Sequence, residues 1–132
     1  MGSARSAWTK ALDRLETYRV HPKRERMGNR VTCVDGLKFR SKLEADRYSE
    51  LKLLRAAGEV KWFLRQVPFD VAPGVIYRAD FLVVWNLGGT VEKITVEDTK
   101  GFLTDTARVK LAVVAQRYGI SVQILTRAQV RG

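Results

Sequence analysis

Two segments of the chain have apolar residues at helical spacing. Residues 42–57 follow Ser41, and Glu44 three positions later completes the pattern of a capped helix start. Residues 105–118 carry one apolar stripe and stop at Gly119, a residue type that commonly ends helices. We therefore expect two amphipathic helices.

Between and after these helices, the pattern changes to runs of β-branched and aromatic residues separated by turn residues. Strands are expected at 60–71, 75–85, 91–99 and 120–125. Three consecutive strands with short connections, and another that follows a helix, predict a mixed sheet. The element order α-β-β-β-α-β thus indicates an α/β (α+β) fold, with helices on the faces of a mixed central sheet.

The first third of the chain differs in composition. Residues 6–19 place apolar side chains on one face of a short amphipathic helix, which could pack on its own domain or form a homodimer contact. Residues 21–30 are almost devoid of apolar side chains and rich in Lys and Arg, so we expect a basic linker. We accordingly divide the chain into a basic N-terminal helix and linker, 1–26, and a folded domain, 27–132.

A β-hairpin is expected at the start of that domain. Residues 30–34 and 37–40 read as two short strands, and the dipeptide between them is Asp35-Gly36. This dipeptide suits the positive φ angles of a type I′ turn, which is the tight turn most typical of hairpins.

The charge balance indicates a polyanionic partner. The 132-residue chain has 24 Lys and Arg against 14 Asp and Glu, which gives a formal net charge of +10 and a pI near 10.2. Such a field attracts phosphates and gives salt-sensitive affinity for nucleic acids. The alternative is a basic protein with solvated charges and no such partner. The side chains that we expect to contact a nucleic acid are Lys23, Arg24, Arg26, Arg30, Lys38, Arg40, Arg108 and Lys110.

Composition also excludes several classes of protein. Cys33 is the one cysteine and His21 the one histidine, so internal disulfides, thiolate metal clusters and two-histidine mechanisms are ruled out. The longest hydrophobic runs are far too short for a membrane span, and no apolar signal segment opens the chain. We expect a cytoplasmic protein without membrane contact, in which carboxylates and lysine would perform any catalysis.

Asp80, Asp98 and Lys100 form the candidate site. Asp80 lies in an otherwise apolar strand, where a carboxylate is costly to bury without a partner or a metal. Asp98 and Lys100 end the next strand, and their spacing places them on one face. Two carboxylates and an ammonium group near one point could hold Mg²⁺ and act on a phosphodiester. The alternative is a solvent-exposed Asp98–Lys100 ion pair, with Asp80 bound to Arg78 or Arg47.

Glu44, Gln66 and three aromatic residues each allow two interpretations. Glu44 could cap its helix only, or it could face the sheet and support a metal. Gln66 could be a polar residue at a strand edge, or it could hydrogen-bond the metal ligands. Trp62, Phe81 and Trp85 have strand spacing, and we expect them in the core rather than as base-stacking platforms.

Several motifs, in a fixed order, resemble one known group of proteins. They are Val34-Asp-Gly-Leu-Lys-Phe-Arg-Ser-Lys-Leu-Glu-Ala-Asp-Arg-Tyr48, Gln66-Val-Pro-Phe, Tyr77-Arg-Ala-Asp-Phe81 and Val96-Glu-Asp-Thr-Lys-Gly101. The chain from about residue 27 to residue 125 resembles a phage- and prophage-encoded family within the PD-(D/E)XK nuclease superfamily. The resemblance implies the restriction-endonuclease-like αβββαβ core, which is the order that the apolar pattern also predicts.

The resemblance further implies catalytic residues. Glu44, Asp80, Asp98 and Lys100 match the catalytic positions of the superfamily. Asp80 and Asp98 would hold Mg²⁺ or Mn²⁺, and Glu44 would support the metal directly or through water. Glu97 could substitute as a ligand if its strand carries a bulge. The sequence departs from the common pattern in two ways: no proline precedes Asp80, and the third-motif acid is Asp rather than Glu.

The implied activity is metal-dependent hydrolysis of phosphodiester bonds in DNA. A phage-type endonuclease that is selective for branched DNA, such as Holliday junctions in recombination, is the expected role. A homodimer would present two symmetric active sites to two strands. The alternative is a non-catalytic basic nucleic-acid-binding protein that retains the nuclease fold.

Overall fold

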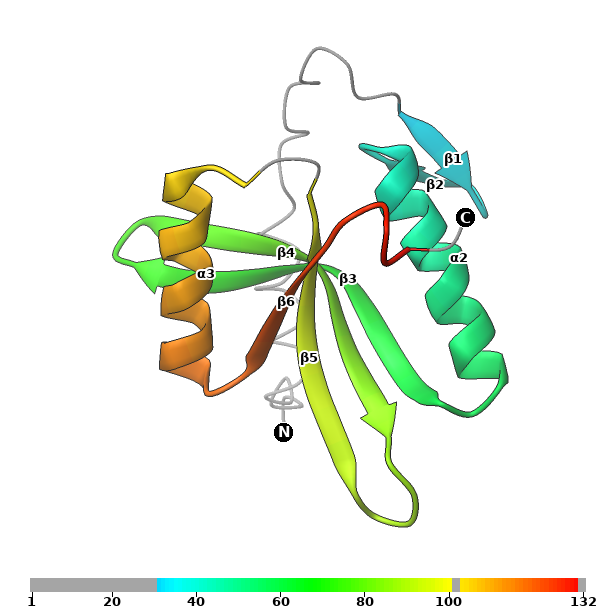
Figure 1. The fold of residues 1–132 in the computed structure, drawn as a ribbon. Helices are drawn as coiled ribbons and strands as arrows, with labels where there is room; N and C mark the ends of the chain where they lie inside the picture. Colours follow the sequence, from blue (N-terminus) through cyan, green and yellow to red (C-terminus); the bar gives the residue numbers. More distant parts are fainter. Residues whose placement is uncertain (1–30, 101–102, 131–132) are drawn as a thin grey trace, which may run out of the picture.

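The computed structural model describes residues 31–100 and 103–130 (Figure 1). The elements in chain order are β1 (Thr32–Val34), β2 (Leu37–Phe39), α2 (Lys42–Ala56), β3 (Val60–Ala72), β4 (Val75–Asn86), β5 (Glu92–Thr99), α3 (Asp105–Tyr118) and β6 (Ser121–Leu125). From α2 onward this is the predicted α-β-β-β-α-β order, and the predicted helices and strands are confirmed with nearly the same bounds.

Some predictions concern residues outside the described ranges. They are the helix at 6–19, the linker at 21–30, and the proposed DNA contacts Lys23, Arg24, Arg26 and Arg30. Within the described ranges, no helix combines the length and apolar character needed to cross a bilayer.

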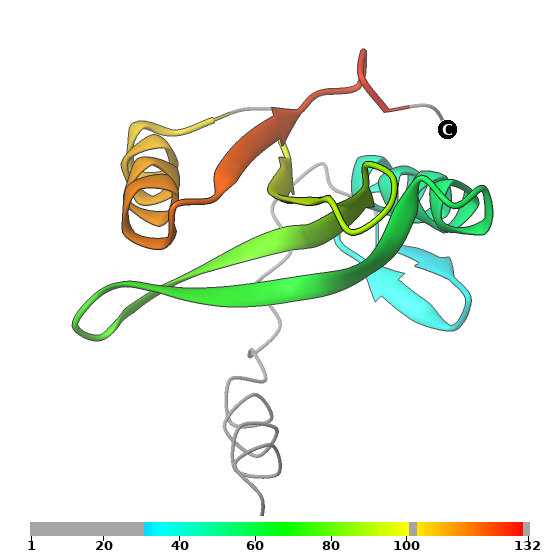
Figure 2. The ribbon, with the colours of Figure 1, turned by 90° about the horizontal axis from the view of Figure 1, so that it is seen from below.

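The central sheet is mixed, as predicted. Its four strands lie in the order β3-β4-β5-β6. The strands β3, β4 and β5 pair antiparallel, and β6 returns through α3 to pair parallel with β5. Figures 1 and 2 both show α3 beside the end of the β3–β4 hairpin that carries its turn, and α2 beside the open end of the hairpin. The protein is therefore a mixed α+β fold with helices at two ends of one sheet.

The predicted turn and cap residues have the geometry that their types favour. Asp35 and Gly36 have φ angles of 52° and 74°, the two positive values of a type I′ turn between β1 and β2. The hydroxyl of Ser41 accepts a hydrogen bond from the backbone N–H of Glu44 at 3.1 Å, which starts α2. Gly119 ends α3 in the left-handed conformation, with φ 62°.

Strand β4 changes faces at Asp80. Tyr77 and Ala79 belong to the apolar cluster beneath α3, whereas Phe81 and Val83 belong to the cluster beneath α2. A regular strand would keep these four alternate side chains on one face. The turning point of the strand therefore lies between Ala79 and Phe81, at the one carboxylate in this apolar stretch of β4.

Strand β3 turns over at the matching position, Gln66. The pairs Arg65–Phe81 and Val67–Ala79 flank it in the register of β3 with β4. Gln66 has a φ of 52°, which is uncommon for a residue with a side chain and strains the backbone. Gln66 and Asp80 thus lie together where the two-stranded ribbon passes from one helix to the other.

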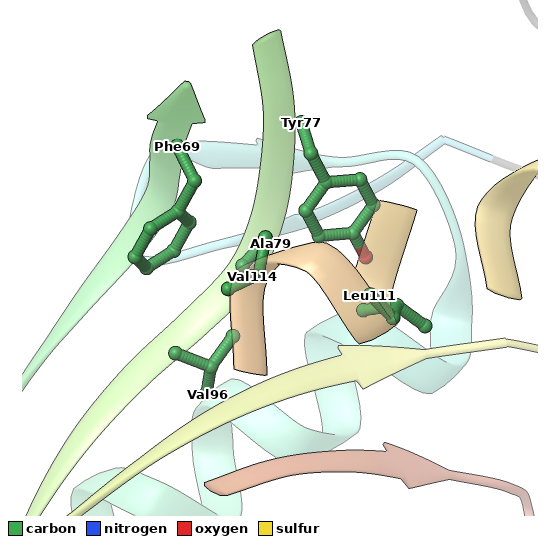
Figure 3. Close-up of a cluster of buried hydrophobic side chains, with 6 residues drawn as sticks. All are labelled: Phe69, Tyr77, Ala79, Val96, Leu111 and Val114. Carbon is green, nitrogen blue, oxygen red and sulfur yellow. The ribbon is translucent and has the colours of Figure 1, made fainter. Parts of the chain in front are cut away.

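The core consists of two clusters, one under each helix. The cluster under α3 joins side chains of β3, β4 and β5 to that helix, as Figure 3 shows, and consists of Phe69, Tyr77, Ala79, Val96, Leu111 and Val114. The cluster under α2 consists of Leu51, Val60, Phe81 and Val83. The site residues lie between these clusters, so packing on both sides fixes the strands that carry them.

The prediction of a buried Trp62 is wrong. Its side chain is 44% exposed, whereas Phe81 is fully buried, as predicted. Trp62 lies on the edge strand β3, and the next residue, Phe63, packs against the cluster beneath α2. Because side chains alternate along a strand, Trp62 points to the face that α2 does not cover.

Candidate functional site

Asp80 lies where β4 separates from β5. The ladder between these strands ends at the pair Phe81–Glu97. Beyond this pair, Oδ2 of Asp80 accepts hydrogen bonds from the backbone N–H and the hydroxyl of Thr99, each at 2.8 Å. If the β4–β5 ladder continued, a backbone carbonyl of β4 would accept the hydrogen bond from the N–H of Thr99. The Asp80 carboxylate accepts it instead. This explains how an apolar strand accommodates a charged residue that is only 2% exposed.

The other oxygen of Asp80 has two longer contacts. Nη2 of Arg40 lies 3.2 Å from Oδ1, and Nε2 of Gln66 lies 3.5 Å from it. The ion-pair partner of Asp80 is therefore Arg40, from the connection between β2 and α2. The alternative named Arg78 or Arg47 as this partner, but Arg47 pairs instead with Glu97 and Glu50.

Glu44 serves its helix and also faces the sheet. Its backbone N–H donates to the cap residue Ser41, as described above, while its side chain is buried. The Glu44 carboxylate accepts a hydrogen bond of 2.7 Å from Nε2 of Gln66. The Gln66 amide therefore bridges Glu44 and Asp80. The strained backbone of Gln66 holds that amide at the turning point of the ribbon.

Asp98 and Lys100 lie on one face at the end of β5. Nζ of Lys100 is 3.4 Å from Oδ2 of Asp98, and the hydroxyl of Tyr77 donates to the same oxygen. Asp98 is only 1% exposed, so the alternative of a solvent-exposed ion pair is wrong. The second oxygen of Asp98, Oδ1, is buried and has no hydrogen-bond partner among residues 31–100 and 103–130. A buried carboxylate oxygen without a partner is a costly arrangement unless a ligand completes it.

Burial, together with repulsion among the carboxylates, raises two of their pKa values. Burial and the negative charge of Asp80 raise the pKa of Glu44 to about 7. Burial and the negative charge of the neighbouring Asp80 carboxylate raise the pKa of Asp98 to about 7. Asp80 thus lies within electrostatic reach of both other carboxylates. The positive charges of Arg40 and Lys100 oppose these shifts without cancelling them.

Glu97 points to the opposite face of β5. Its carboxylate accepts two hydrogen bonds from Arg47 of α2, at 2.8 and 2.6 Å. The β4–β5 pairing runs in regular register from Phe81–Glu97 to Asn86–Glu92, without the bulge that would turn Glu97 toward Asp80. Glu97 therefore anchors α2 to the sheet next to the site.

Several residues of this site lack a distinctive signal in the sequence. Tyr77 and Thr99 bind the carboxylates directly, and both belong to the motifs around Asp80 and Asp98. Arg65 adds a positive charge that opposes the raised pKa of Glu44. The Arg65 guanidinium lies 4.2 Å from the ring centroid of Phe39. Arg65 directly precedes Gln66 in the sequence, but an arginine on a strand does not by itself predict a role at a site.

The expected DNA-contact residues within the described ranges lie on two parts of the fold. Lys38 is exposed on β2, and Arg40 reaches the carboxylates from the neighbouring connection. Arg108 is exposed and Lys110 partly buried on α3, which lies at the far end of the ribbon (Figure 1). Of these residues, only Arg40 is shown in contact with a site carboxylate.

The donor set fits a hard divalent cation. Mg²⁺ prefers oxygen ligands, keeps several waters, and is often bound through one or two carboxylates together with a substrate phosphate. Asp98 offers a buried oxygen without a partner, and Asp80 offers the oxygen with the longer contacts. Within residues 31–100 and 103–130, no three His, Cys, Asp or Glu side chains form a ready-made metal-binding group. A cation here would therefore be held by the Asp80 and Asp98 pair.

Comparison with known proteins places the chain in a family. Searches of curated proteins and of solved structures found no match. Residues 24–129, which include every strand and helix described above, match the family described as "Protein of unknown function (DUF1064)". The chain therefore belongs to the DUF1064 family.

Proposed function

We propose that this protein is a metal-dependent DNA endonuclease that hydrolyses phosphodiester bonds. The observation that carries the proposal is the arrangement around Asp80, which Gln66 links to Glu44 and which lies within electrostatic reach of Asp98, with Lys100 3.4 Å from Asp98. Three buried carboxylates in a chain of net charge +10 are unfavourable for the fold alone. They are useful where a divalent cation and a phosphate must be held together.

The proposed roles follow from the positions of the side chains. Asp80 and Asp98 would hold Mg²⁺ or Mn²⁺, which when bound acts as a Lewis acid on the phosphate and lowers the pKa of water. Glu44 and Gln66 form a second side of the same cluster and orient Asp80. Lys100, with its ammonium 3.4 Å from Asp98, would orient the nucleophile or stabilise negative charge that develops on the phosphate.

The proposal also covers the preferred DNA substrate and the oligomeric state of the active protein. The element order α-β-β-β-α-β and the four site residues fit a restriction-endonuclease-like core of the PD-(D/E)XK type. Nothing in the amino-acid sequence reads as a base-recognition motif, which favours recognition of DNA backbone and shape. We therefore propose branched DNA, such as a Holliday junction, as the preferred substrate, and a homodimer as the active form.

One observation favours a second candidate function, a non-catalytic basic DNA-binding protein. Both oxygens of Asp80 already have partners within the protein, namely Thr99, Arg40 and Gln66. A carboxylate satisfied in this way can be purely structural. The unpartnered oxygen of Asp98 is not explained by this alternative.

Cleavage assays separate the two functions. Labelled four-way junction, matched linear duplex, single-stranded DNA and RNA are incubated with Mg²⁺, Mn²⁺ or EDTA. We expect junction cleavage that requires the metal and is lost in Asp80→Asn. Asp70→Asn is the matched control, because Asp70 is an exposed carboxylate on the neighbouring strand β3. Binding without cleavage by folded wild-type protein, with every metal and substrate, would establish the binding protein instead.

A further inference from the structure

Arg40 connects the protein surface with the buried carboxylates. Its side chain is 37% exposed, whereas the side chain of its partner Asp80 is 3% exposed. Arg40 precedes the cap residue Ser41, in the short connection between β2 and α2. A partly exposed guanidinium can leave its ion pair at small cost, because water replaces the lost partner.

The contact involves the more available oxygen of Asp80. Oδ2 accepts two hydrogen bonds of 2.8 Å from Thr99. The contacts of Oδ1 are longer, 3.2 Å to Arg40 and 3.5 Å to Gln66. Longer hydrogen bonds are weaker, so Oδ1 is the oxygen from which a competing cation would displace a partner most easily. Arg40 thus occupies the position at Asp80 that a bound metal would need.

Arg40 also acts as a counter-ion for the rest of the cluster. Its positive charge opposes the raised pKa values of Glu44 and Tyr77. A divalent cation beside Asp80 would bring a larger charge to the same carboxylates. Two cations at one oxygen repel each other, so a metal ion bound there weakens the contact of the guanidinium with Asp80.

We propose that Arg40 is a resident counter-ion of the carboxylate cluster and that a divalent cation displaces it, so that the Arg40–Asp80 contact and metal binding exclude each other. This inference rests on the proposed metal-dependent function. In the loaded protein, the displaced guanidinium lies on the solvent side of the site, where it is available to a phosphate of DNA.

The test measures Mn²⁺ binding from the electron paramagnetic resonance signal of free Mn²⁺. Measurements at about pH 8 lie above the raised pKa values of Glu44 and Asp98, which keeps proton competition small. We expect Arg40→Gln to bind Mn²⁺ roughly fivefold more tightly than wild type. We expect Arg40→Lys, which keeps a cation, to remain close to wild type. A gain in affinity cannot result from a damaged fold.

Arg127→Gln is the matched control. Arg127 is a partly exposed arginine that pairs with Asp46 at 2.7 Å, away from the cluster, so its loss removes the same charge without opening Asp80. We expect its Mn²⁺ affinity to equal that of wild type. In wild-type protein, the Nε–H nuclear magnetic resonance signal of Arg40 should also shift on addition of Mg²⁺, while that of Arg127 stays.

Two results would overturn the displacement and leave the nuclease proposal standing. One is Mn²⁺ binding by wild type that Arg40→Gln leaves unchanged or weakens. The other is an equal gain in Arg127→Gln, which would indicate a general charge effect. Absence of Mn²⁺ binding in wild type and in every variant would overturn both proposals. Binding by Arg40→Gln alone would also overturn the displacement, because the cation would then fail to displace Arg40 in the wild-type protein.

Discussion

Glu97 and Asp98 are consecutive buried carboxylates on β5, yet their surroundings differ completely. Glu97 faces α2, where Arg47 matches both of its oxygens with short hydrogen bonds. Asp98 faces Asp80, keeps one oxygen without a partner in the part of the chain that the structure describes, and has a pKa raised to about 7 by burial and by that neighbour. A buried carboxylate whose two oxygens both bind an arginine, as in Glu97, holds α2 against the sheet. A buried charge that the protein leaves partly unmatched is suited to a ligand.

The largest expected contrast between the two residues is in catalysis. Asp98→Asn removes a proposed metal ligand, and we expect it to reduce metal-dependent DNA cleavage by roughly 10³-fold, as the loss of a main electrostatic group does elsewhere. DNA binding should remain or become tighter, because one negative charge leaves a basic surface. Single-turnover cleavage and filter binding measure these two effects. Cleavage at the wild-type rate would refute the assignment of Asp98.

The next contrast is in stability, where we expect the larger effect from the change at Glu97 and the smaller effect from the change at Asp98. Glu97→Gln leaves the buried guanidinium of Arg47 without its full partner, so we expect the free energy of unfolding to fall by about 3 kcal/mol. Asp98→Asn removes repulsion from Asp80 and should not destabilise the protein at about pH 8. Urea denaturation measures both values.

A double variant sharpens this comparison. Removing both charges, with Glu97→Leu and Arg47→Met together, should recover much of the lost stability, because neither buried charge is then unpaired. If Glu97→Gln unfolds at the same urea concentration as wild type, then the pair does not anchor α2. If Asp98→Asn is the less stable of the two single variants, the comparison between the neighbouring carboxylates fails.

The third prediction concerns the pH dependence of stability, to which the raised pKa values of Glu44 and Asp98 contribute. The ordinary pKa values of Glu44 and Asp98, 4.5 and 3.8, both rise to about 7 in the folded protein. The folded state therefore binds more protons than the unfolded state between about pH 4 and 7, and stability falls as the pH rises through this window. We expect a loss of stability across this window, which Asp98→Asn and Glu44→Gln each reduce.

Urea denaturation in a series of buffers measures this dependence. Asp70→Asn serves as the control, because its carboxylate is exposed on β3. A wild-type stability that rises from about pH 5 to pH 8 would contradict the raised pKa values of Glu44 and Asp98.

The fold was predictable from residues whose signals are local. Ser41, Asp35-Gly36 and Gly119 mark element ends through backbone geometry that few other residues favour, so the strand and helix order followed from them. Asp80 and Asp98 were found because a carboxylate in an apolar strand is conspicuous.

Other features depend on tertiary contacts that no local pattern encodes. Arg40 reaches Asp80 across 40 positions of sequence, and Arg47 reaches Glu97 across 50. The exposure of Trp62 follows from which face of the sheet α2 covers, and periodicity alone gives no face. The reversal of faces at Gln66 requires a positive φ at a residue with a side chain, which propensity does not predict.

The smallest expected effect is stabilisation by the metal, which should depend on Asp98 and not on Glu97. A ligand that binds only the folded state raises the free energy of unfolding by an amount set by its concentration relative to Kd, here about 1 to 2 kcal/mol at moderate saturation. Thermal unfolding with Mg²⁺ or with EDTA measures the shift. We expect the wild-type Tm to rise with Mg²⁺, Asp98→Asn to lose that rise, and Glu97→Gln to keep it despite its lower Tm. An equal Mg²⁺ effect in both variants would place the cation away from the Asp80–Asp98 pair.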